Sequence, residues 1–324
     1  MKRIILDTDI GTDVDDAMAL SLAAVSPELE IVGVTTVHAD TPLRSRIARR
    51  LLALAGRGDI PVIAGASQPL KMPLPKNFTW MPTLRGHEGI GILSAEELIP
   101  TPNREVTADD AARFIIKQAA ANRGDLSLIA IGPLTNIGRA LQLEPRLSDW
   151  ICDLVMMGGT VYAEKFTFPP MLETNLNADP EASELVFASG IPLTIVPMEI
   201  TTQVYLTPEQ RKMMVDWNKP LSTTLVTLME KMFDGLASLS VEAGLDADFY
   251  QGRTFMHDPL AVYTAFSSRY IRTRRMNVQY EIIDDVVRTM PYPDRSPNCH
   301  VCIEVDADAF ISFWLDRIQS HGFL

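Results

Sequence analysis

The sequence predicts an α/β protein with one open, mostly parallel sheet flanked by helices, and three observations lead to this fold class. Short apolar, β-branched segments alternate with segments of helical periodicity along most of the 324 residues. The first such unit is strand, helix, strand, which joins parallel strands through a right-handed crossover. Neither an internal repeat nor a linker-like change of composition divides the chain. We therefore expect a single domain over residues 1–324.

The first elements follow from the apolar pattern. The β-branched segment over 31–37 is long enough for a buried strand. Thr41 and Pro42 predict an N-cap followed by the first residue of a helix, and Gly56 predicts the end of that helix. The expected order is strand 3–6, helix 17–25, strand 31–37, helix 44–55 and strand 61–64.

Two irregular stretches, 66–102 and 158–178, interrupt the alternation. Both are longer than ordinary connections, and long loops in compact proteins are usually functional, so we expect both to lie near a binding site. The remaining expected helices cover 107–122, 135–143, 180–188, 208–242 and 307–318, and the remaining expected strands cover 126–131, 154–157, 193–197, 280–283 and 301–305.

Composition excludes several classes of protein. Apolar residues make up 47% of the chain, which excludes a disordered or low-complexity protein. The 29 Lys and Arg residues against 41 Asp and Glu residues give a net charge of −12, whose field repels nucleic acid and anionic membranes. No apolar run approaches the roughly 18 residues that span a bilayer. Three cysteines are too few for a disulfide framework, so we expect a cytoplasmic protein with no membrane or nucleic-acid partner.

Cys299 and Cys302 have the spacing of half a zinc site. The other half is missing from the neighbouring sequence. Strand alternation over 301–305 also turns the two thiols to opposite faces of a sheet, so we expect both to be packing residues.

The segment after the first strand is strongly acidic, with Asp7, Asp9, Asp13, Asp15 and Asp16 within ten residues. It lies between the carboxyl end of a buried strand and the start of a helix, where ligands of open α/β sheets bind. Helix capping would use only one or two of these side chains. Five like charges repel one another unless a cation neutralises them or some of them take up protons. A hard divalent cation is the less costly solution, and calcium accepts six to eight oxygen ligands. The segment therefore predicts a site for a hard divalent cation.

Two known motifs fit this segment poorly. An EF-hand loop fails, because its fifth and sixth positions, counted from Asp7, hold Gly11 and Thr12. A phosphatase of the haloacid-dehalogenase type also places Asp-x-Asp after its first strand and uses the first Asp as its nucleophile. Asp7 would then be the nucleophile of a magnesium-dependent enzyme, an alternative that leaves Asp13, Asp15 and Asp16 without a role.

An ordered set of further motifs runs through most of the chain. After the acidic segment come Val34-Thr-Thr-Val37, Gly132-Pro-Leu-Thr-Asn136, Met157-Gly-Gly159, Glu173-Thr-Asn175, Asp179-Pro-Glu-Ala182 and His257-Asp-Pro259. In this order the motifs resemble those of the nucleoside hydrolases, the inosine-uridine preferring family, which use calcium to cleave the N-glycosidic bond of ribonucleosides. The resemblance implies a Rossmann-like fold for this chain.

The resemblance also implies a role for each matching residue. Asp9 would be both a calcium ligand and the general base that activates water, and His257 would be the general acid beside the leaving base. The other implied calcium ligands are Asp16, Asp258 and the backbone carbonyl of Ile131, and the implied ribose-binding residues are Asp15, Asn175, Glu173 and Met157.

The chain departs from the family pattern at two places near these residues. Five residues, 10–14, separate Asp9 from the double Asp, where the family usually has three, so Asp13 is an alternative to Asp15 at the ribose. Asp40 stands where the family commonly has an Asn, and we expect it on the sugar or metal side of the site.

These resemblances predict a calcium-dependent hydrolase that releases free base and ribose in nucleoside salvage. Its partner would be a small ribonucleoside, and the family suggests a homodimer or homotetramer. Besides the magnesium phosphatase, a non-catalytic relative that binds ribose or calcium remains an alternative.

Overall fold

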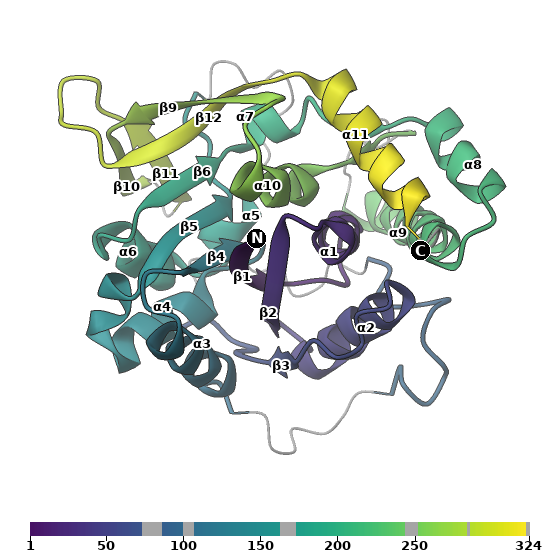
Figure 1. The fold of residues 1–324 in the computed structure, drawn as a ribbon, viewed down its shortest axis with the longest axis horizontal. Coiled ribbons are helices and arrows are strands. Elements are labelled where there is room, and N and C mark those ends of the chain that lie inside the picture. The colour runs from purple at the N-terminus through teal and green to yellow at the C-terminus, as the bar shows by residue number, and fades with distance from the viewer. Residues whose placement is uncertain (73–85, 100–106, 163–172, 244–251, 284–285, 322–324) are drawn as a thin grey trace.

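Eight strands form one twisted sheet that crosses the whole molecule (Figure 1). The computed structural model describes residues 1–72, 86–99, 107–162, 173–243, 252–283 and 286–321. Across the sheet the strands are β3 (Val62–Ala64), β2 (Leu29–Thr36), β1 (Lys2–Thr8), β4 (Leu126–Ala130), β5 (Ile151–Met157), β6 (Leu193–Val196), β12 (Cys299–Val305) and β9 (Ile271–Met276). All neighbours are parallel except β12 and β9, which are antiparallel. The predicted fold class, an open and mostly parallel sheet, is confirmed.

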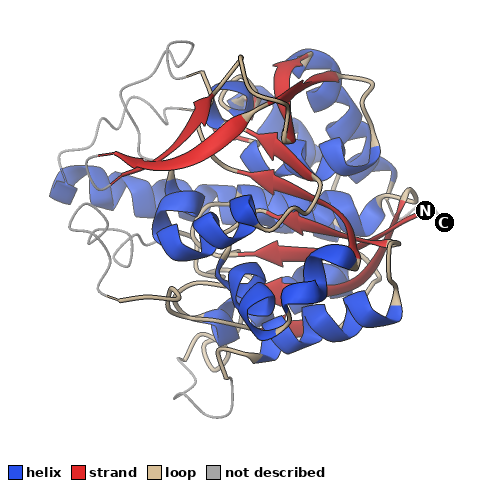
Figure 2. Ribbon diagram, turned by 90° about the vertical axis from the view of Figure 1, so that its left-hand side faces the viewer, coloured by secondary structure: helices blue, strands red, loops and turns tan. Residues whose placement is uncertain are grey.

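Helices cover both faces of this sheet (Figure 2). They are α1 (Asp15–Val25), α2 (Thr41–Leu54), α3 (Asp110–Ala121), α4 (Thr135–Leu143), α5 (Thr174–Ala178), α6 (Pro180–Ala188), α7 (Met198–Thr201), α8 (Pro208–Asp216), α9 (Pro220–Ala243), α10 (His257–Phe266) and α11 (Ala307–Ser320). Residues of α1, α2, α10 and α11 share one core cluster, whereas residues of α3, α4 and α6 share the other. Because side chains alternate along a strand, Ile4 and Leu6 face the first cluster and Ile5 faces the second.

The same alternation decides the environment of the two carboxyl-terminal cysteines. Cys299 belongs to one core cluster and Cys302 to the other, so their thiols lie on opposite faces of β12, as predicted. Both are buried, and burial raises the pKa of Cys299 to about 11 and that of Cys302 to about 12. Neither thiol is therefore ionised at neutral pH.

Two small antiparallel sheets complete the fold. β10 (Val278–Ile283) and β11 (Val286–Pro291) form a hairpin, and β7 (Tyr205–Leu206) pairs with β8 (Thr254–Phe255). The hairpin lies against α5 and α6. It brings residues near the carboxyl end of the chain onto the end of the sheet where β5 leads into its following loop.

The structure corrects several expected boundaries. The second irregular stretch contains α5, whose five residues are too few for a periodic pattern, and residues 73–85, 100–106 and 163–172 lie outside the described residues. The first residue of α2 is Thr41, and the N-cap is Asp40 instead of Thr41. β9 was not expected, because its sequence IRTRRM is exposed along most of its length and lacks the apolar signal of a buried strand.

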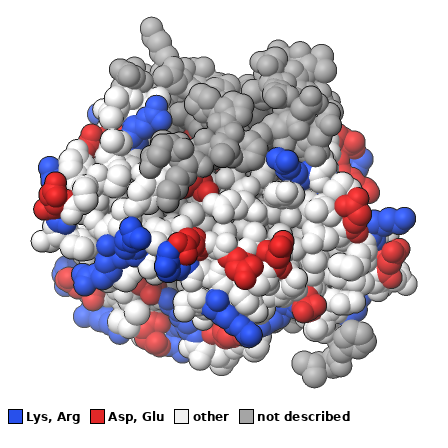
Figure 3. All heavy atoms as spheres, turned by 90° about the horizontal axis from the view of Figure 1, so that it is seen from above, with Lys and Arg blue, Asp and Glu red and all other residues white. Residues whose placement is uncertain are grey.

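In the described residues, no helix has the length and apolar character needed to cross a bilayer. On the face shown in Figure 3, the visible acidic and basic side chains are interspersed.

The strand order 3-2-1-4-5-6 places β1 between β2 and β4, so successive connections run in opposite directions from β1. This reversal is the topological switch point at which open α/β sheets bind their ligands. The acidic segment follows β1 and therefore lies at this point, beside the segments that follow β2 and β4.

Candidate active site

Three carboxylates from opposite ends of the chain meet at the switch point. Asp15 and Asp16 are the first two residues of α1, and Asp258 is the second residue of α10. The two helices pack together, and oxygen atoms of the three side chains lie within 4.8 Å of one another. The backbone amide of Asp258 donates to Asp15 Oδ2 at 3.4 Å across 243 positions of sequence. We call Asp15, Asp16 and Asp258 the carboxylate cluster.

The carboxylate cluster carries unfavourable negative charge. Each member is at most 4% exposed, and burial raises all three pKa values well above the usual range for aspartate. Neighbouring carboxylates raise them further, and Asp9 and Asp13 act on every member. Five carboxylates therefore share one electrostatic environment. Oxygen donors that repel one another in this way fit a hard divalent cation, which replaces the repulsion by attraction.

Asp9 and Ile131 follow the neighbouring strands β1 and β4. A Cβ atom on Gly132 would lie 2.7 Å from Asp9 Oδ1, so the glycine leaves the space that the Asp9 side chain occupies. The amide of Ile131 donates to the Asp7 carbonyl at 2.9 Å, which fixes the two loops side by side. The first residue of the Gly-Pro-Leu-Thr-Asn motif is thus needed for close approach.

Glu173, Asn175 and Met157 gather beside the Ile131 carbonyl. Glu173 caps α5 by accepting from the amides of Asn175 and Leu176, at 2.8 and 3.0 Å. Asn175 Nδ2 donates to the carbonyl oxygens of Ile131 and Met157, at 3.1 and 3.2 Å. Burial raises the pKa of Glu173 to about 7. Residues from three segments, the loop after β4, the end of β5 and the start of α5, therefore form one wall of the site.

His257 begins α10 directly before Asp258. Its Nδ1 lies 2.7 Å from Thr201 Oγ1, and its ring stacks on Phe255 with centroids 5.3 Å apart. Burial lowers the pKa of His257 to about 4, so the imidazole is neutral at pH 7. With Nδ1 engaged by Thr201, the nitrogen available to other groups is Nε2.

Asp13 and Asp40 differ in their surroundings. Asp13 Oδ1 accepts from the Val14 amide at 2.6 Å, and burial raises the pKa of Asp13 to about 6. Asp40 Oδ1 accepts from the Leu43 amide at 2.9 Å and so caps α2. The contacts of Asp40 give it a structural role, and its expected place at the sugar or metal stays a prediction.

Asp7 lies within β1, where side chains of neighbouring segments hold it, although Asp9 also contributes to its raised pKa. Its Oδ1 accepts from Thr35 Oγ1 at 2.5 Å and from Asn136 Nδ2 at 2.7 Å, and the residue is 1% exposed. Burial raises the pKa of Asp7 to about 7. A nucleophile must be ionised and reachable, so this environment does not favour the phosphatase alternative.

Two further residues hold the site from α7, which follows β6. Glu199 is 2% exposed, and its Oε1 accepts from the amides of Val161 and Tyr162 at 2.9 and 2.8 Å. Thr201 contacts His257. A single helical turn thus fixes the loop after β5 and the imidazole, and no motif in the sequence marks Thr201 for this role.

The hairpin β10–β11 supports the wall from outside. Asn177, in α5, accepts from the Val287 amide at 2.7 Å and donates to the Glu173 carbonyl at 2.8 Å. Thr289 Oγ1 accepts from the Thr160 amide at 2.9 Å. Sequence analysis missed Asn177 and Thr289, because both act through backbone groups more than a hundred positions away and no local pattern records such a contact.

Replacement of Asn177 by alanine should destabilise the protein. The change removes an acceptor for the buried Val287 amide and a donor to Glu173, and such losses cost about 2 kcal/mol of unfolding free energy. Urea denaturation measures the loss. Gln319→Ala, at an exposed position of α11, is the control and should change the midpoint little. Equal midpoints for the two variants would show that the hairpin contributes nothing here.

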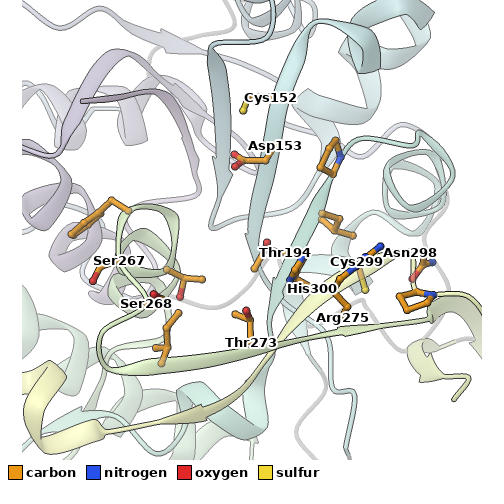
Figure 4. Close-up of a pocket in the computed structure, with 16 residues that line it drawn as sticks. Cys152, Asp153, Thr194, Ser267, Ser268, Thr273, Arg275, Asn298, Cys299 and His300 are labelled. Atoms are coloured by element: carbon orange, nitrogen blue, oxygen red, sulfur yellow. The ribbon is translucent and has the colours of Figure 1, made fainter.

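A pocket lies at the opposite end of the parallel strands, where β5, β6 and β12 begin (Figure 4). Its walls come from the starts of β5 and β6, represented by Asp153 and Thr194, and from Cys299 and His300 at the start of β12. The carboxyl end of α10 reaches it through Ser267. It is therefore separate from the carboxylate cluster, which lies at the amino end of α10.

Comparison with known proteins gives matches over nearly the full length. Residues 4–312 match the family model described as inosine-uridine preferring nucleoside hydrolase. Probable uridine nucleosidase 2 of Arabidopsis thaliana is 28% identical over 340 residues, with 98% of both chains covered. Pyrimidine-specific ribonucleoside hydrolase RihA of Salmonella typhi is 28% identical over 327 residues, with 98% of this chain and 99% of the relative covered. The solved structure of a purine-preferring ribonucleoside hydrolase from Gardnerella vaginalis is 28% identical with a TM-score of 0.77, and 98% of both chains is covered.

Proposed function

Because this chain belongs to the inosine-uridine preferring nucleoside hydrolase family and is an N-ribosyl hydrolase, we propose that it cleaves ribonucleosides with the help of a bound calcium ion. The observation that carries the calcium proposal is the meeting of Asp15, Asp16 and Asp258 within 4.8 Å. Oxygen-only donors and buried like charges suit this ion.

The residues divide into two groups around the reacting sugar. We assign the ion to Asp9, Asp16, Asp258 and the carbonyl of Ile131. The ribose hydroxyls are assigned to Asn175, Glu173, Met157 and Asp15, and the place of Asp15 in the carboxylate cluster puts its share of the ribose next to the ion. Asp13 remains the alternative to Asp15, because it belongs to the same electrostatic group. A calcium ion bound there would supply positive charge that lowers the pKa of a nearby water and orients sugar hydroxyls.

The reaction needs a general base that accepts a proton from water on one side of the sugar, and a hydrogen-bond or proton donor to the departing nucleobase on the other. Hydrolysis at the ribosyl carbon passes through an oxocarbenium-like transition state, which the surrounding carboxylates stabilise by their negative charge. Asp9 accepts the proton of the attacking water. Because water displaces the nucleobase directly, the configuration at the ribosyl carbon inverts and no covalent intermediate forms.

His257 is proposed to assist departure of the base. When Nδ1 accepts from the Thr201 hydroxyl, the neutral imidazole carries its proton on Nε2 and can donate a hydrogen bond to the departing nucleobase; full proton transfer needs the imidazolium, which the lowered pKa of His257 disfavours. Proton transfer or hydrogen bonding to a leaving group is worth about 10²- to 10⁴-fold in rate. The contact with Thr201 fixes the ring, so the imidazole keeps its orientation through the reaction.

The biological setting follows from the family and from composition. The relatives named above include a uridine nucleosidase, a pyrimidine-specific hydrolase and a purine-preferring hydrolase, so the substrate class is ribonucleosides and salvage is the role we propose. We also propose a cytoplasmic location, in line with the three free cysteines, and a homodimer or homotetramer, which the family suggests.

A direct assay tests the proposal. Purified protein is incubated with inosine, uridine and p-nitrophenyl riboside, in calcium and after chelation with EGTA, and with p-nitrophenyl phosphate as a phosphatase control. We expect free base and ribose in calcium, loss of activity in EGTA and recovery when calcium is added back. Phosphate release without nucleoside cleavage would favour the phosphatase alternative. Calcium binding without turnover of any riboside would favour a non-catalytic relative.

A further inference from the structure

The Arg44 side chain is buried at the junction of the acidic loop and the end of β2, with 3% exposure. We propose that Arg44 is a positioning residue, which holds the turn carrying Asp9 in its working shape before any cation binds. The inference rests on the role proposed for Asp9 and extends it to a residue that lies outside the motifs.

The guanidinium of Arg44 joins the loops that follow two neighbouring strands. Its Nη1 donates to the carbonyl oxygens of Asp9 and Ile10, the latter at 2.9 Å. Its Nη2 donates to Thr12 Oγ1 at 3.1 Å, and its Nε donates to the His38 carbonyl at 2.7 Å. The planar guanidinium group has several N–H donors in fixed directions and can make these contacts at the same time. A lysine ammonium is a single compact charge and cannot reach all of these acceptors at once.

The four backbone carbonyl groups of the turn Asp9–Thr12 accept hydrogen bonds from donors that lie outside the turn. Arg44 binds the first two carbonyl groups, and the amides of Glu88 and His87 donate to the last two at 2.6 and 3.3 Å. Buried carbonyl groups need such partners, and this turn has no helix or strand of its own to provide them. Its shape is therefore imposed by α2 and by the loop that contains His87.

The loop that contains His87 fits closely against the turn. A Cβ atom on Gly86 would lie 1.5 Å from the carbonyl oxygen of Thr12, so only glycine allows this approach. The turn is thus enclosed on one side by Arg44 and on the other by backbone. Both contacts are made between groups of the protein itself and do not involve a cation.

The other anchor of Arg44 lies in a strained turn. His38 and Ala39 have φ values of 69° and 55°, a region that costs energy for residues other than glycine. The bond from Arg44 to the His38 carbonyl joins this turn to Asp9. The turns after β1 and β2 are therefore held as one unit.

The charge of Arg44 does not by itself decide its role in the loaded enzyme. Its hydrogen-bond partners described above are uncharged oxygens, and its positive charge offsets part of the effect of burial on the pKa values of Asp9 and Asp16. A bound cation and the guanidinium repel each other. The charge of Arg44 thus acts in both directions, since it favours ionised carboxylates and repels the cation, and the role that we assign to Arg44 rests on the hydrogen bonds that shape the turn.

Arg44→Lys tests this inference, because it keeps the charge and removes the planar guanidinium group. Arg50→Lys, at an exposed position of the same helix, is the matched control. Calcium binding is measured by calorimetry with calcium alone, and kcat and KM are measured with inosine at saturating calcium. We expect Arg44→Lys to weaken calcium binding about tenfold and to lower kcat about tenfold, with KM changed by less than about threefold. The control should match the wild type.

Hydrogen exchange of the unaltered protein gives an independent test. Peptides covering residues 9–14 are followed in EGTA and in calcium, and we expect closely similar exchange because the turn is already ordered. Much faster exchange in EGTA would overturn the inference, and so would wild-type calcium affinity and kcat in Arg44→Lys. If that variant does not fold, the exchange result decides. If the wild type cleaves no riboside, the proposed function fails, whereas exchange and calcium titration still test the role of Arg44.

Discussion

Asp9→Asn is expected to lower kcat/KM for inosine by at least about 10³-fold at saturating calcium, the largest loss of activity that we foresee. The amide keeps the shape of the carboxylate but cannot accept the proton of the attacking water. It is also a weaker ligand for a hard cation. Release of free base, followed by absorbance, measures the loss. The change should leave the fold intact, because the space beside Gly132 accepts a side chain of the same size.

Asp59→Asn serves as the control for this variant. Asp59 is exposed near the start of β3, far in sequence from every residue of the group of five carboxylates, and its variant should retain wild-type activity. Wild-type kcat/KM in a folded Asp9→Asn protein would remove Asp9 from the mechanism.

Asp258→Asn should separate stability from cation binding. Burial and neighbouring carboxylates raise the pKa of Asp258, so its negative charge is unfavourable in the protein without a cation. The neutral amide relieves that repulsion, and we expect the variant in EGTA to melt at the same temperature as the wild type or higher. Calcium should then stabilise it much less. For the wild type, a ligand at a hundred times its Kd adds about 2.7 kcal/mol to the free energy of unfolding.

Thermal melts of both proteins, in EGTA and in calcium, give the four values needed. Asp316→Asn, on an exposed part of α11, controls for the loss of one charge and should keep the full calcium effect. A calcium-induced shift in Asp258→Asn equal to that of the wild type would exclude Asp258 as a ligand. Nucleoside cleavage by the variant should fall together with the calcium effect, since both depend on the same ion.

Local patterns predicted the central part of the fold and much of the site. β1, the acidic segment and α1 are contiguous, so apolar periodicity and charge density reveal them together. The resemblance of motifs added Asp258, which no local argument connects to Asp16. The structure then brings these two residues into one cluster.

What the sequence could not predict depends on distant contacts or on weak local signals. β9 is an exposed edge strand rich in arginine, and α5 is shorter than a helical pattern needs. Arg44 is one of several arginines in its helix, and its burial follows from the surrounding loops, which the sequence does not reveal. Asn177 likewise gains its role from a hairpin more than a hundred positions later.

The packing of α1 against α10 has a consequence for the order in which the enzyme matures. As the chain is synthesised, Asp15 and Asp16 emerge early, and Asp258 follows only after about four-fifths of the protein has been made. A truncated product that ends before α10 therefore lacks one of the carboxylates and the imidazole, whatever part of the sheet it has formed. The proposed cation site is therefore complete only in a chain that has folded through α10.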